Sequence, residues 1–238
     1  MKIQFLLFSL LLCLSACETP NLLVSNDLKS NTTVMAAKGR QGWQFNQVIR
    51  YGNYTTSKVK RGWTRSSDIK FVLRFQKAQN KLSFTQMTPD NQQAEVLAVG
   101  KFLNNELELL NGFMSISLKY ENTFAGTILP NDKTLPVWDF IIYNPDASMP
   151  KDTDLGMARN DEGEAILIRG VKKLEGQGKW ARLDNLGFEF IHNGHSIGAV
   201  STLNNGQVWM KNDISPSLKL VISSISTSLL LRHSLQNN

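Results

Sequence analysis

The apolar stretch at residues 215–232 constrains the fold of this chain more than any other segment. Between positions 218 and 231 its apolar side chains point to every side of a helical wheel, Ser and Thr fill most of the gaps, and Lys219 is the only charge. A helix on a domain surface needs a polar stripe, so this segment is expected to be a helix buried on all sides. Ser215 and Pro216 have the residue types of an N-cap and a first helical position, which favours a helix over the alternative, a strand whose apolar residues alternate with serines.

Upstream of this stretch, from Trp43 onward, the chain is predicted to form about twelve short strands. Runs rich in Val, Ile, Phe, Trp and Thr alternate with Gly, Asn, Asp and Pro, which is typical of a many-stranded antiparallel fold. Asn193 and Gly194, like Asn205 and Gly206, have the residue types of tight hairpin turns. The predicted strands cover residues 44–51, 54–61, 70–77, 81–87, 94–102, 115–120, 123–129, 137–143, 164–171, 187–192, 196–203 and 207–211.

The strand number and the last helix together predict a barrel with a filled interior. A closed barrel of about eight strands is filled by its own side chains, whereas a larger one leaves a cavity. A helix with its side chains is about 10 Å across and can occupy that space. The expected fold is therefore mainly β, an antiparallel barrel of about twelve strands with a buried C-terminal helix, formed by residues 39–238.

The segment 187–231 carries a family resemblance. Its strand GFEFI, turn HNG, strand HSIGAV, turn NNG, strand QVWMK and final helix resemble the tubby C-terminal-like fold, which is shared with the phospholipid scramblases and the LURP-one proteins. The resemblance covers about a fifth of the chain and implies that the last helix threads the barrel. Tubby-like domains are associated with phosphoinositides, but none of the family's binding residues can be placed on this chain.

A lipocalin-like barrel is the rival fold. That family has Gly-x-Trp near its first strand, whereas this chain has Gly42 directly before Trp43 and Gly62 directly before Trp63. The lipocalin helix packs on the outside of its barrel and should be amphipathic, which the helix at 215–232 is not.

The first residues have the pattern of an export signal. Lys2 precedes an apolar run at 3–14, which is shorter than the about 20 residues needed to span a bilayer. Leu14, Ser15, Ala16 and Cys17 follow and resemble the lipobox of bacterial lipoproteins. The resemblance implies a signal peptide at residues 1–16 and acyl chains, such as palmitate, on Cys17. An ordinary secretory signal is the alternative.

The resemblance to lipoproteins also predicts the compartment. The protein is expected in the cell envelope, anchored to a membrane and facing outside the cytoplasm. Lipoproteins retained in the inner membrane usually have Asp directly after the acylated cysteine. This chain has Glu18 there, which favours the outer membrane if the host has two membranes. Cys13 leaves with the signal and Cys17 is modified, so the mature domain has no thiol for a disulfide, a metal site or a nucleophile. Residues 17–38 are polar, and their apolar residues do not recur at the spacing of a helix or a strand. They are predicted to be a flexible tether.

Three patterns suggest chemistry, but none is complete. Residues 194–198 satisfy G-x-S-x-G, yet the strand that follows Ser196 does not fit the strand-to-helix turn of a nucleophile elbow, so a serine hydrolase is only a minor alternative. His192 and His195 flank one turn without a third ligand nearby. The acidic residues between positions 146 and 164 are expected to form a solvated loop that matches a calcium-binding pattern only in part. No catalytic residue, metal site or cofactor is therefore predicted.

The charge distribution indicates a surface for an anionic partner. Residues 38–81 contain eleven Lys and Arg residues and one acid, although the whole chain has a net charge of +6. Lys58 and Lys60 share one strand face, and Lys70 and Arg74 share the next. These four cations are predicted to contact anionic phospholipid, lipopolysaccharide or a protein partner; a basic face that only aids solubility is the alternative. Nucleic acid is not an expected partner of an exported protein.

The sequence thus predicts a non-enzymatic, lipid-anchored protein of the cell envelope that contacts anionic lipid or a protein partner through a basic face. The alternative is a lipocalin-like carrier of a small apolar ligand. A barrel filled by a helix has no room for such a ligand, so the place of the last helix distinguishes the two.

Overall fold

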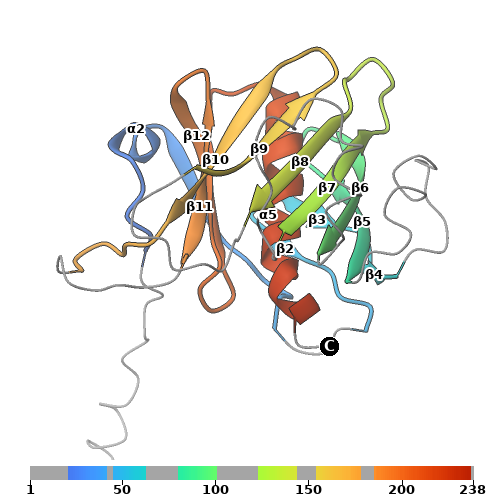
Figure 1. The fold of residues 1–238 in the computed structure, drawn as a ribbon, viewed down its shortest axis with the longest axis horizontal. Helices are drawn as coiled ribbons and strands as arrows, with labels where there is room; N and C mark the ends of the chain where they lie inside the picture. Colours follow the sequence, from blue (N-terminus) through green and yellow to red (C-terminus); the bar gives the residue numbers. More distant parts are fainter. Residues whose placement is uncertain are drawn as a thin grey trace, which may run out of the picture.

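The computed structural model describes residues 21–41, 45–62, 80–100, 123–143, 154–177 and 185–236. Thirteen antiparallel strands form one sheet, which curls around a long C-terminal helix into a nearly closed barrel (Figure 1). The predicted fold class is confirmed. The described part of the chain has no helix that is both long and apolar enough to cross a membrane.

The elements keep the labels of Figure 1. The helices are α2 (Asn26–Lys29) and α5 (Pro216–Gln236). The strands are β1 (Thr32–Ala36), β2 (Arg50–Tyr51), β3 (Tyr54–Thr56), β4 (Lys60–Arg61), β5 (Lys81–Met87), β6 (Gln93–Gly100), β7 (Thr123–Pro130), β8 (Trp138–Tyr143), β9 (Asp154–Asn160), β10 (Ala165–Val171), β11 (Gly187–His192), β12 (His195–Ser201) and β13 (Gln207–Lys211). The predicted strands at 70–77 and 115–120 lie outside the described residues.

The barrel closes through a single bridge. Twelve strands follow one another in the order β1-β13-β12-β11-β10-β9-β8-β7-β6-β5-β3-β2, and β4 pairs with β5 beside this path. The two ends of the path meet where Lys38 N donates to Arg50 O (2.8 Å) and Arg50 N donates to Lys38 O (3.1 Å). Two backbone hydrogen bonds therefore join β2 to the residues that directly follow β1.

The hairpin turns follow the predicted residue types closely. Asn193 and Gly194 have φ values of 50° and 80°, as the two-residue turn between β11 and β12 requires. In the next turn Gly206 has φ of 92°, as expected, but Asn204 (φ 48°) takes the other positive angle in place of the predicted Asn205.

Helix α5 occupies the interior of the barrel. The predicted N-cap is confirmed, because Leu218 N donates to Ser215 Oγ at 3.2 Å. All residues from 220 to 232 are buried, which confirms the helix and excludes the strand alternative for this stretch. The inward phenylalanines of the sheet pack with the apolar side chains of α5 in one core: Phe84, Phe124, Phe140, Phe188 and Phe190. Figure 1 shows α5 standing between the walls of the barrel.

A buried polar network fixes the register of α5 against the sheet. The Tyr51 hydroxyl donates to Ser223 O (2.9 Å) and lies 3.0 Å from Thr227 Oγ1. Thr227 Oγ1 in turn donates to Gln86 Oε1 (2.8 Å). Buried polar groups need hydrogen-bond partners, so sliding or turning the helix would break this chain of bonds. At the far end of the helix, Arg40 Nε donates to Leu230 O at 2.9 Å.

Two expectations are corrected by the described residues. Residues 21–38 were expected to be a flexible tether, but they contain α2 and β1, and β1 pairs with β13. Apolar side chains of this segment pack against apolar side chains on the outer face of the sheet, and their burial stabilises the segment there. Likewise Asp154–Asn160, part of the predicted acidic loop, forms β9 between β8 and β10.

Candidate functional site

Residues 21–31, here called the strap, lie against the outer face of the wall formed by β10–β13. Leu23 N donates to Lys173 O (2.8 Å), Glu175 N donates to Asn21 O (3.0 Å), and Lys29 Nζ lies 2.8 Å from Glu175 Oε1. Apolar side chains of the strap and the wall form a second, smaller core: Leu22, Val24, Leu28, Val171, Leu186, Ala199 and Trp209. The strap thus fastens the start of the described chain to this wall.

Carboxylates of Asp27 and Glu189 hold the middle of the strap. Asp27 accepts hydrogen bonds from Lys211 Nζ and from Ser196 N, both at 2.9 Å. Glu189 Oε1 accepts a hydrogen bond from Ser25 N at 3.0 Å. The hydrogen bond from Lys211, followed by that from Ser196, holds the pKa of Asp27 below its ordinary value of 3.8.

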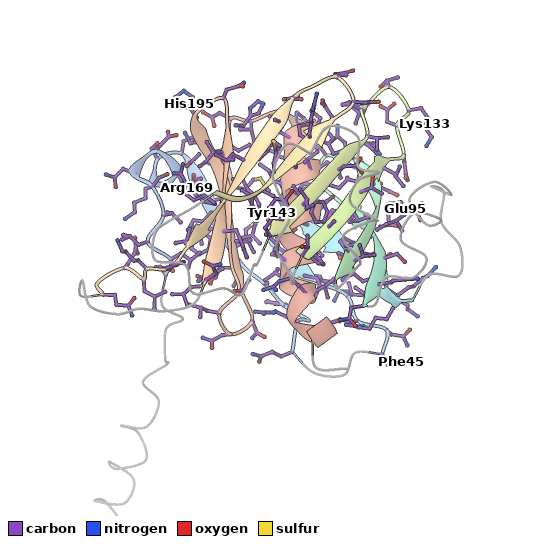
Figure 2. All side chains as sticks on the ribbon, in the orientation of Figure 1. Phe45, Glu95, Lys133, Tyr143, Arg169 and His195 are labelled. Atoms are coloured by element: carbon purple, nitrogen blue, oxygen red, sulfur yellow. The ribbon has the colours of Figure 1, made fainter. Side chains whose placement is uncertain are left out.

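A hollow of about 350 Å³, here called the strap pocket, lies between the strap and the end of β10. This volume is at the lower end of the range for small-ligand sites. It is lined by Leu23, Val24, Ser25, residues 169–173 and Glu189. Arg169, Lys172 and Lys173 give it three cations, and Figure 2 shows Arg169 on this wall of the barrel. With Glu189 as the one acidic residue, the lining of the strap pocket carries more positive than negative charge.

Glu189 is the acidic side chain of the strap pocket. Its side chain points outward from β11, directly across from Arg169 of β10, and only 4% of the residue is exposed. Oε1 accepts bonds from Ser25 N (3.0 Å) and Ser196 Oγ (2.9 Å). These bonds offset part of the cost of burying a carboxylate.

The predicted surface cations lie elsewhere. Lys58 and Lys60 are exposed on either side of the buried Val59, and β4 places Lys60 beside β5. From β10 to β5 the barrel path is β10-β9-β8-β7-β6-β5, which puts these lysines on the wall opposite the strap pocket. Lys70, Arg74 and the predicted lipid-anchor residue Cys17 lie outside the described residues.

Ser196 has a structural environment. It lies in β12, which continues to Ser201, so no helix follows it as a nucleophile elbow requires. The residue is 6% exposed, and its hydroxyl donates to Glu189. The second glycine of the motif, Gly198, faces α5: a Cβ there would lie 3.0 Å from Ile222 Cγ2. The motif is therefore explained by the hairpin and by close packing of the helix.

The two histidines of the same hairpin have separate acidic partners. His192 Nε2 lies 2.8 Å from Glu164 Oε1, and His195 Nδ1 lies 3.5 Å from Asp27 Oδ2. Among the residues with a described placement, no three His, Cys, Asp or Glu side chains are grouped so that they could hold a metal ion. Of the predicted acidic loop, Asp146 and Asp152 lie outside those residues.

Sequence reasoning missed the strap, its pocket and the role of Glu189. The signal for α2 was present, because Ser25 is an N-cap residue whose Oγ accepts a bond from Leu28 N at 3.3 Å. Glu189 stands between two inward phenylalanines, which indicates an outward side chain. Nothing in the local pattern shows that another segment covers it.

Comparisons with protein-family models, with curated proteins and with solved structures find no match for this chain. The resemblance to tubby C-terminal-like domains therefore stays a prediction.

Proposed function

We propose that this chain is a non-enzymatic protein of the bacterial cell envelope, anchored to a membrane by acyl chains on Cys17 and in contact with anionic lipid head groups. The observation that carries the proposal is the short distance in sequence between Cys17 and the strap. Only three residues separate Cys17 from Asn21, where the described part of the chain begins. At about 3.3–3.6 Å per residue, Asn21 lies within roughly 14 Å of the lipid.

This short connection brings the strap wall to the membrane surface. Cations close to an anionic surface gain about 1 kcal/mol each, and salt weakens the gain. Lys173, an exposed cation of the strap pocket, would add to the acyl chains, which contribute about 0.8 kcal/mol per buried methylene. The strap pocket is a better candidate for lipid contact than Lys58 and Lys60, because those lysines lie on the opposite wall.

The filled barrel supports this proposal over a carrier of an apolar ligand. Residues 220–232 of α5 are buried in the interior, where a carrier would need a cavity. The same arrangement, about twelve strands around a C-terminal helix, supports the proposed kinship with tubby-like domains.

Acylation of Cys17 tests the anchor. The full chain is produced in a bacterial host with an alkyne-labelled palmitate analogue, and the membranes are fractionated. We expect label on the wild-type chain in the membrane fraction, and in the outer membrane if the host has two. The Cys17→Ala variant should carry no label. Label that persists in Cys17→Ala, or its absence from the wild type, would refute the anchor.

A further inference from the structure

We propose that the free edge of β1 binds an extended peptide of a partner protein, which adds to the sheet as an antiparallel strand and carries an acidic side chain toward Lys38 and Arg50. The site lies at the seam, here defined as the gap between β1 and the hairpin of β2 and β3. The inference goes beyond the proposed function, because it needs neither the acyl anchor nor the strap pocket.

The register of β1 shows which of its backbone groups face the seam. Ala37 N donates to Gly206 O (2.9 Å), and Asn212 N donates to Asn31 O (3.0 Å). In an antiparallel pair hydrogen-bonded residues alternate, so the odd-numbered residues of β1 bond to β13. The even-numbered residues turn their N–H and C=O groups toward the seam. These residues are Thr32, Val34 and Ala36.

The groups that face the seam have no partner within the described chain. Lys38 and Arg50 bridge the seam at one end, and no other backbone hydrogen bond of the described residues crosses it. Val34 is 51% exposed, and Ala36 is exposed as well. Beside the bridge, β1 is therefore an open edge strand.

This edge lacks the features that usually protect an edge strand. Natural sheets block their edges with charged residues, prolines or bulges, because an open edge pairs with other chains. Residues 31–37 have the sequence NTTVMAA, which contains no charged residue and no proline. The edge of β1 is therefore suited to accept a further strand.

A pocket of about 210 Å³ lies at the same seam. Its lining includes Met35 of β1, Tyr54 of β3 and Met210 of β13, which all belong to the core of the barrel. When a peptide adds to a sheet edge, main-chain hydrogen bonds give affinity, and pockets for alternate side chains give specificity. We therefore expect the peptide to place one apolar side chain in this pocket.

The closed end of the seam favours an acidic residue in the peptide. Lys38 and Arg50 are both exposed, and their backbones pair with each other. The ion pairs of the described chain involve other residues, so neither side chain has an acidic partner there. A carboxylate beside them would form charge-assisted hydrogen bonds.

A second copy of this chain fits the edge less well than a peptide does. Its own β1 has no acidic residue to offer Lys38 and Arg50. An edge of this length also buries far less than the about 1,200–2,000 Å² of a stable protein interface. A short acidic peptide meets both conditions.

Fluorescence anisotropy on the full chain in neutral detergent tests the edge. The probe is a labelled, end-blocked peptide EAVLT, whose antiparallel register puts V opposite Val34, L over the pocket and E beside Lys38. N-methylation of V removes the N–H that faces β1 and should weaken binding by about tenfold or more. N-methylation of L, whose N–H points away from β1, is the matched control and should weaken binding less. Equal effects of the two methyl groups, or no binding of EAVLT, would overturn the proposal.

The peptide QAVLT tests the acidic residue. It should bind the wild type about tenfold more weakly than EAVLT, because it loses the charge-assisted bonds. Lys38→Gln with Arg50→Gln should remove this difference, whereas Lys133→Gln at the β7–β8 turn should preserve it. Equal binding of the two peptides to the wild type would overturn the assignment of an acidic partner.

Variants at position 34 test the backbone contact and the rival occupant. Val34→Pro removes an N–H that β13 does not use and should abolish binding of EAVLT, whereas Val34→Thr keeps the N–H and should bind like the wild type. A dimer in analytical ultracentrifugation that Val34→Pro abolishes and Val34→Thr keeps would assign the edge to a second copy and overturn the peptide. The methylated peptides on the wild type decide the proposal even if a variant fails to fold.

Discussion

At the scale of single residues, Tyr51 shows how the barrel interior selects one position of α5. Its hydroxyl contacts both Ser223 and Thr227, and it is fully enclosed. Burial raises the pKa of Tyr51 far above its ordinary value, so the phenol stays neutral and acts as a donor. The ring also stacks on Tyr54, with centroids 5.5 Å apart.

Removing this hydroxyl should weaken the fold measurably. We expect Tyr51→Phe to lower the free energy of unfolding by about 1–2 kcal/mol, because it leaves Ser223 O without its side-chain donor. Urea titration measures the change. The neighbouring Tyr54→Phe is the matched control and should cost less than about 0.5 kcal/mol, the usual range where no buried contact is lost. Equal losses for the two variants would contradict the role given to the Tyr51 hydroxyl.

Asp27 makes strap stability depend on pH. Lys211 holds the pKa of this carboxyl below its ordinary 3.8 in the folded chain, so its contribution to stability is present above pH 3.8 and is lost as the pH falls through the lower, folded value. We expect Asp27→Asn to melt at a lower temperature than the wild type at neutral pH, with the difference closing in acid.

Melting temperatures measured from neutral pH downward check this prediction. Asp161→Asn, in the exposed turn after β9, is the control and should follow the wild type. A difference between Asp27→Asn and the wild type that stays constant down to the lowest pH would show that the carboxylate charge does not hold the strap.

At the scale of elements, Gly198 determines how closely α5 approaches β12. A Cβ at this position would lie 2.9 Å from Trp209 O and 3.0 Å from Ile222 Cγ2. We expect Gly198→Ala to destabilise the protein by about 1–3 kcal/mol through overpacking. Ile222→Ala removes the Cγ2 methyl that such a Cβ would meet, so the double variant should be more stable than the sum of the single losses predicts. Strict additivity in urea titrations would contradict the contact.

Elements with a local signal were predicted, and those that depend on distant partners were not. The Ser215 cap, the all-round apolar face of α5 and the turn at Asn193 and Gly194 are contained in a few neighbouring residues. Strand β1 is five residues long and pairs with β13, nearly 180 positions away, so its short sequence could not show its partner. The strap was missed for the same reason: its apolar residues are recognised as buried only when the wall beneath them is known.

At the scale of the whole molecule, the order of strands around the barrel changes the functional expectation. The excess of basic residues between positions 38 and 81 suggested one cationic face near a tether. Two described lysines of that segment, Lys58 and Lys60, lie on the wall opposite the strap, while Arg169, Lys172 and Lys173 lie beside it. Charge counted along the chain could not reveal this, because position around a barrel depends on strand order.

The most direct test of the account is which part of the barrel lies at the membrane. Lys173, Lys60 and Lys133 are exposed on the strap wall, on the opposite wall and at the β7–β8 turn, and Figure 2 shows Lys133 far from Arg169. Each is changed to Cys in turn in the acylated full chain, labelled with a fluorophore and bound to vesicles carrying a lipid-attached quencher. We predict the strongest quenching at position 173. Quenching at position 60 or 133 that equals or exceeds it would contradict the account.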